Sequence, residues 1–167
     1  MVYIALMNHS HSDDADPKPK TQVIGIGNDF RGDDGAGPYV ARKLKGLMPL
    51  NANIFEATGE ATELMGLWEK RENVILIDAV FSGSIPGTVY RYDVRKKALQ
   101  ASHFESRSTH AFGVVQAIAL EMTLNTLPQK LIIYGIEGDS FNLGTEITPE
   151  IMEAAENVIE LILEEIG

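Results

Sequence analysis

Cysteine is absent from this sequence of 167 residues. Its absence excludes disulfide bonds, zinc ribbons, iron–sulfur clusters and a thiol nucleophile. Long apolar runs are missing too, because no segment approaches the roughly 20 apolar residues that a membrane-spanning helix needs. The apolar start Met1–Met7 is short for a signal peptide and has no basic segment before it. We therefore expect a cytoplasmic protein.

Basic residues are scarce, with 14 Lys and Arg against 24 Asp and Glu, which gives a formal net charge of -10. A surface of this charge repels nucleic acid and anionic membranes, so we expect neither as a partner. Hydrophobic residues make up 44% of the chain and charged residues 23%, as is typical of a globular protein. We predict a disordered polar tail over residues 1–20 and a single domain over residues 21–167.

Strand and helix patterns alternate along this domain. The apolar segments predict five strands, at Thr21–Gly27, Asn53–Ala57, Asn73–Val80, Thr88–Asp93 and Gln129–Glu137. Four helices are predicted at Asp34–Met48, at Thr62–Lys70 with Thr62 as N-cap, from Ser108 or Thr109 to Leu124, and from Thr148–Pro149 onward. The fold class is therefore α/β, a single-domain three-layer sandwich. Its five-stranded sheet is expected to be twisted and mostly parallel, with one antiparallel edge strand and helices on both faces.

The loop Gly25–Gly37 follows the first predicted strand and resembles a phosphate-binding glycine loop. Its third glycine position is occupied by Phe30, so the dinucleotide fingerprint is incomplete. Asp33 and Asp34 would also repel a pyrophosphate from the helix start. Either aspartate could serve as an N-cap, but together they favour a metal site over a nucleotide site.

Three further polar residues are expected at the carboxyl ends of the strands, where open α/β sheets carry their functional groups. Asp78 ends a strand that should be buried on both faces, Glu137 ends the last strand, and His110 lies at a helix start. The positive helix end favours a neutral imidazole, which is the form that binds metal. Asp34, Asp78 and His110 thus offer two carboxylates and one imidazole for a divalent metal ion.

These residues lie in segments that resemble the hydrogenase maturation endopeptidases. The matching pieces are Gly25–Asn28, Asp33–Gly37, Ile77–Ala79, Pro86–Thr88, Ser108–His110 and Gly135–Glu137. The resemblance implies that Asp34, Asp78 and His110 occupy the metal-binding positions, and that nickel arrives with the substrate rather than as a resident cofactor. It also implies removal of a C-terminal extension from the nickel-loaded large-subunit precursor of a nickel–iron hydrogenase. We expect a monomer.

The segment Glu56–Ala61 departs from the Asp-Gly-Gly-Thr-like turn that is frequent in this family. We name Gly27, Asn28, Glu56 and Glu137 as candidate substrate-binding residues. Two chemistries fit: nickel acts as a Lewis acid, or it only anchors the precursor while Asp34 or Asp78 acts as general base on a water molecule. A non-enzymatic nickel-binding chaperone or sensor and a nucleotide-binding protein are the alternatives.

Overall fold

The computed structural model describes residue 19 and residues 21–96 and 110–167, so the predicted tail lies outside it except for Pro19. Four strands run parallel in the order β2 (Ala52–Ala57), β1 (Thr21–Ile26), β3 (Asn73–Val80) and β5 (Lys130–Glu137). The fifth, β4 (Val89–Asp93), pairs antiparallel with β5 at the edge. This confirms the predicted mostly parallel sheet with one antiparallel edge strand.

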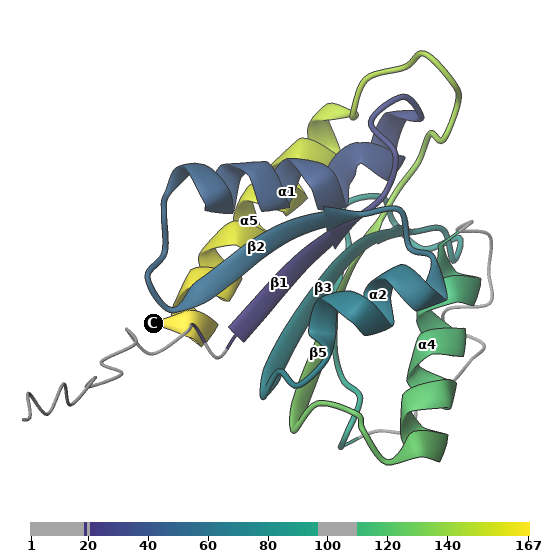
Figure 1. The fold of residues 1–167 in the computed structure, drawn as a ribbon. Coiled ribbons are helices and arrows are strands. Elements are labelled where there is room, and N and C mark those ends of the chain that lie inside the picture. The colour runs from purple at the N-terminus through teal and green to yellow at the C-terminus, as the bar shows by residue number, and fades with distance from the viewer. Residues whose placement is uncertain (1–18, 20, 97–109) are drawn as a thin grey trace, which may run out of the picture.

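Helices cover both faces of the sheet (Figure 1). On one face, α1 (Ala36–Gly46) packs against α5 (Pro149–Ile166), and on the other, α2 (Ala61–Trp68) packs against α4 (Ala111–Leu124). A short 3-10 helix, η1 (Gly32–Gly35), precedes α1. Within the part of the chain that the structure describes, no helix has both the length and the apolar character required to cross a membrane.

The sheet separates two apolar clusters. Along β3, Ile75 and Ile77 pack on the α1–α5 side, whereas Val74 and Leu76 pack on the α2–α4 side. Successive side chains of a strand point to opposite faces, so the unbroken apolar run of β3 reflects burial on both sides. The same alternation directs the side chain of Asp78 to the α2–α4 side, toward the helix that follows His110.

Three predicted helix starts differ from the structure. The first helix was expected from Asp34, but η1 occupies that position and α1 begins at Ala36. Thr62 was expected as an N-cap, but α2 begins at Ala61 with Glu60 in the N-cap position. The prediction was wrong because the Glu63 carboxylate accepts hydrogen bonds from the Thr58 N–H and hydroxyl, at 2.9 and 2.6 Å. These contacts hold the chain before α2, so that the helix begins one residue before Thr62. The expected caps Ser108 and Thr109 lie outside the described residues, and His110 itself occupies the N-cap position of α4.

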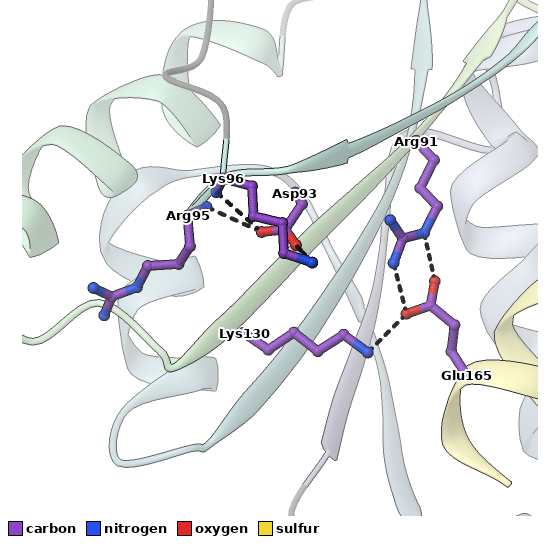
Figure 2. A network of polar contacts seen from close by, with 6 residues as sticks. All are labelled: Arg91, Asp93, Arg95, Lys96, Lys130 and Glu165. Atoms are coloured by element: carbon purple, nitrogen blue, oxygen red, sulfur yellow. Dashed lines mark hydrogen bonds and ion pairs between the residues drawn. The ribbon is translucent and has the colours of Figure 1, made fainter.

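A network of ion pairs fastens the C-terminal turn of α5 to the antiparallel edge of the sheet (Figure 2). The Glu165 carboxylate accepts hydrogen bonds from Arg91 at 2.8 and 3.1 Å and from Tyr134, and it pairs with Lys130 at 3.0 Å. Burial alone would raise the pKa of Glu165, but the hydrogen bonds from Arg91, Tyr134 and Lys130 outweigh it and lower the pKa from 4.5 to about 2.

Replacing Glu165 tests this network through its pH dependence. Because the folded-state pKa lies below the ordinary value, the charge stabilises the fold above pH 4.5 and this contribution is lost as the pH falls toward about 2. Glu165→Gln should therefore lower the free energy of unfolding at about pH 6, and its difference from wild type should shrink steadily toward about pH 3. Urea denaturation measures both proteins, and the exposed neighbour Glu164→Gln serves as control. A difference independent of pH would contradict the assignment.

Candidate functional site

The glycine loop after β1 brings the start of α1 close to the sheet. Gly27 has a φ of 150°, and a Cβ atom at this position would lie 1.9 Å from the carbonyl oxygen of Asp34. The Asn28 N–H donates to that same carbonyl at 3.2 Å. The glycine at position 27 therefore permits a close approach between two backbone segments. Its effect is to fix Asp34 beside the end of β1.

Asp34 contacts His110, which lies 76 residues later in the chain. Asp34 Oδ2 lies 3.1 Å from His110 Nε2. Asp34 is 1% exposed and is held in the η1 turn, whereas the imidazole sits half-buried at the start of α4. His110 occupies an N-cap position but makes no side-chain cap hydrogen bond, so its ring is directed to Asp34 instead. The predicted proximity of these two residues is therefore present in the structure.

Asp78 completes the charge environment of the imidazole. It is 1% exposed near the carboxyl end of β3. The hydrogen bond to Asp34 raises the pKa of His110 above its ordinary value; burial opposes this effect, and the charges of Asp78 and Asp34 and a hydrogen bond to the Thr58 backbone reinforce it. The neighbouring carboxylates therefore oppose the effect expected of the helix start, which favours the neutral ring.

The three side chains have the chemistry of a divalent metal site, with two carboxylates and one imidazole. Among the residues that the structure describes, no three His, Cys, Asp or Glu side chains are grouped closely enough to hold a metal ion. The arrangement present is an Asp34–His110 hydrogen bond with a second buried carboxylate near the ring. Such a set can bind a metal that draws the groups together, or hold a water molecule for general base catalysis.

The loop between β2 and α2 packs directly against His110. Gly59 has a φ of 90°, and a Cβ atom there would lie 2.8 Å from His110 Cβ and 3.0 Å from Nδ1. Since Nε2 faces Asp34, the ring is held between this loop and the carboxylate. A cavity of about 360 Å³ opens beside it, lined by Thr58, Gly59, Glu60, Ala61, His110, Phe112, Gly113 and Gln116. The segment Glu56–Ala61 therefore packs against His110, although it lacks the turn expected from the family resemblance.

The proposed substrate-binding residues occupy different surroundings. Glu56 pairs with Arg42 at 2.7 Å, and the same guanidinium forms two hydrogen bonds with Asp29, at 2.9 and 2.7 Å. Asn28 accepts a hydrogen bond from the Phe30 N–H at 2.9 Å. Glu137 is fully buried and accepts hydrogen bonds from the backbone N–H groups of residues 82–84 and from the Ser82 hydroxyl. Glu137 thus holds the loop after β3, and substrate binding by Gly27, Asn28, Glu56 and Glu137 stays a prediction.

Asp33 has a role that sequence reasoning missed. Its buried carboxylate accepts hydrogen bonds from the N–H groups of Asp139, Ser140 and Thr148, at 2.8, 2.8 and 2.7 Å, and from the Thr148 hydroxyl at 2.9 Å. It therefore binds the loop between β5 and α5. No local pattern distinguishes Asp33 from Asp34, because its partners lie more than a hundred residues away.

Comparison with known proteins gives one consistent result. A family model described as hydrogenase maturation protease matches residues 38–165, which include Asp78 and His110. The chain is 29% identical over 153 residues to the hydrogenase expression/formation protein HupD of Thiocapsa roseopersicina, covering 87% of this chain and 67% of HupD. It is 24% identical over 144 residues to the hydrogenase 2 maturation protease of Escherichia coli, and the match covers 84% of this chain and 87% of that protein.

The fold is also similar to that of a solved structure, the hydrogenase maturating endopeptidase HybD from E. coli. The TM-score is 0.76 at 23% sequence identity, and the match covers 87% of this chain and 90% of that one. At this identity the likeness concerns the fold, which confirms the predicted α/β class with its single antiparallel edge strand.

Replacing Asp33 separates its role from that of its neighbour. In the native protein, the two carboxylate oxygens of Asp33 accept all four hydrogen bonds. Asparagine has one oxygen and an NH₂ group instead, so Asp33→Asn leaves buried N–H groups without an acceptor. We expect the free energy of unfolding to fall by about 3 kcal/mol, as measured by urea denaturation. Asp139→Asn, at an exposed position on the same loop, is the control and should stay within about 0.5 kcal/mol of wild type. Unchanged stability of Asp33→Asn would refute the role.

Proposed function

The chain belongs to the hydrogenase maturation protease family and is a peptide hydrolase of that family; on this premise we propose its substrate and its mode of recognition. The substrate is the large-subunit precursor of a nickel–iron hydrogenase, from which the enzyme removes a C-terminal extension. Asp34, Asp78 and His110 recognise the nickel ion that the precursor carries. The protein acts on this precursor as a monomer.

The observation that carries the proposal is the contact between Asp34 and His110 beside the buried carboxylate of Asp78. These groups come from three separate elements: η1, the start of α4, and β3. Two carboxylates and one imidazole leave coordination positions open for the precursor's own ligands. A metal already held by the precursor can therefore be shared between the two proteins.

Sharing the metal would orient the precursor for cleavage. Once one of its bound groups is fixed, the adjoining peptide bond is confined near Asp34 and Asp78, which raises the effective concentration of the reacting groups. Hydrolysis then requires a water molecule to attack the carbonyl carbon and the amine to leave with a proton. Either carboxylate can take the proton from water as general base, or the nickel ion can polarise the carbonyl.

The test uses purified precursor prepared with and without nickel, with cleavage followed by mass spectrometry. We expect wild type to cleave only the nickel-loaded form, and Asp34→Ala, Asp78→Ala and His110→Ala each to lower the rate by about 100-fold or more. Glu160→Ala is the control and should cleave like wild type, because Glu160 is exposed on α5 and lies outside the loops that carry the three residues. A thermal melt of every variant establishes that the fold is intact.

Three results would contradict the proposal. Equal cleavage of both precursor forms would exclude recognition of nickel. Normal rates for two of the three alanine variants would show that the site is wrongly assigned. Tight binding of the loaded precursor by wild type without any cleavage would favour the chaperone or sensor alternative.

The contact between Gly59 and His110 gives a second test. A methyl group at position 59 would lie within 3.0 Å of the imidazole, so Gly59→Ala must displace the ring or the loop. We expect processing of the loaded precursor to fall by about tenfold or more, since small misplacements of a positioned group are costly. Gly83→Ala is a matched control: its φ of 86° resembles the 90° of Gly59, but a Cβ atom there meets nothing within 4 Å. Equal rates for the two variants would show that the loop does not position His110.

A further inference from the structure

Two loops at the carboxyl end of the sheet are joined into one unit, here termed the double loop: residues 28–35 and residues 138–148. Three backbone hydrogen bonds connect them, from Gly32 N–H to Thr145 O at 3.1 Å, from Asp33 N–H to Ser140 O at 2.8 Å, and from Gly144 N–H to Phe30 O at 2.8 Å. The four hydrogen bonds to the buried Asp33 carboxylate add to these. The double loop is therefore held in one conformation by its own polar contacts.

Apolar side chains of the double loop pack against the core of the domain. Phe141 packs edge-on against Phe81, with ring centroids 5.9 Å apart and an interplanar angle of 76°. Phe141 and Ile147 also pack against the apolar cluster between the sheet and the α1–α5 layer. The loop thus has a buried apolar side, and hydrophobic burial opposes its detachment.

Two large apolar side chains lie on the outside of the same unit. Phe30 is 76% exposed and Leu143 is 78% exposed. Their backbones are adjacent, because the Gly144 N–H donates to the Phe30 carbonyl. Neither side chain contributes much to the core, so the fold itself does not require a phenylalanine and a leucine at these positions. A pre-ordered backbone that presents apolar side chains loses little conformational entropy when it binds a partner.

The exposed charged side chains of the double loop are mainly acidic. Asp139 and Glu146 are exposed on the 138–148 segment, which contains no Lys or Arg. Asp29 lies next to Phe30, where Arg42 pairs with it, and Arg31 is the only basic residue of the 28–35 segment. Charged rims favour partners of opposite charge and speed their encounter. A complementary surface would be apolar at its centre and would carry Lys or Arg at its rim.

We propose that the double loop is the docking surface for the hydrogenase large-subunit precursor, which presents an apolar depression rimmed by Lys or Arg. This inference rests on the proposed function. Its basis is that Asp34 belongs to the same loop as Phe30, only four residues away. A partner seated on Phe30 and Leu143 would contact the same hydrogen-bonded loop that holds Asp34 against His110.

The experiment measures binding of the nickel-loaded precursor and, separately, its cleavage. We expect Phe30→Ser and Leu143→Ser each to weaken binding by about tenfold, and the double variant by about 100-fold, with a matching rise in KM and little change in kcat. Leu50→Ser is the control, because Leu50 is 91% exposed in the connection from α1 to β2 at the opposite end of the sheet. It should bind and cleave like wild type.

A second pair of variants tests the charge of the rim. Glu146→Lys should weaken binding and make it less sensitive to salt, whereas Glu160→Lys, on the exposed side of α5, changes the net charge equally and should have little effect. Equal effects of the two variants would contradict the proposal that the precursor carries Lys or Arg at the rim of its binding surface.

The outcomes separate docking from catalysis. Wild-type affinity of the Phe30→Ser/Leu143→Ser double variant overturns the docking surface and leaves the proposed function intact. Failure of wild type to bind the precursor at all also overturns it. Tight binding by wild type without cleavage, lost on the double variant, supports the docking surface and sinks the proposed endopeptidase activity.

Discussion

The buried carboxylate of Asp33 is the interaction on which the arrangement of the site depends. It accepts hydrogen bonds from three backbone N–H groups and one hydroxyl between β5 and α5. It therefore joins the loop after β1 to the loop after β5. A charge without these donors would be costly at full burial. Because Asp33 and Asp34 are consecutive in a 3-10 turn, their side chains point about 120° apart. Fixing one toward the 138–148 loop directs the other toward His110.

The pKa of His110 depends more on the carboxylates beside its ring than on its position at a helix start. The start of α4 offers about half a unit of positive charge spread over several N–H groups. Asp34 Oδ2 lies 3.1 Å from His110 Nε2, and the charge of Asp78 also acts on the ring. The hydrogen bond to Asp34, reinforced by the charges of both carboxylates, raises the pKa of the imidazole above its ordinary value. A reading of His110 from its place at a helix start alone misses this result, because the carboxylates come from β3 and η1.

Most of the fold could be predicted because its signals are local. The unbroken apolar run of β3, the alternation along β4 and the Thr148–Pro149 helix start each lie within a few residues, and the structure contains all three elements. The start of α2 was misplaced because Glu63 closes the preceding turn through Thr58. Within the site, Asp34, Asp78 and His110 were expected to form one metal site; the structure brings Asp34 and His110 into contact, and the metal site stays a prediction. The contacts that Asp33, Arg42 and Glu137 make in the structure could not be predicted, since their partners come from distant segments and no periodicity encodes those contacts.

The loop after β2 packs against His110 without the turn that the family resemblance leads us to expect. Glu56 lies where an acid is expected, but Arg42 already pairs with it, so a substrate group that binds Glu56 must compete with a guanidinium. Gly59, by contrast, keeps the close backbone approach that holds His110. The backbone of this loop therefore supports the histidine, while its acidic side chain shares the Arg42 guanidinium with Asp29. The exposed Phe30 and Leu143 of the double loop, in contrast to Glu56, are not engaged in an ion pair and lie outside the core.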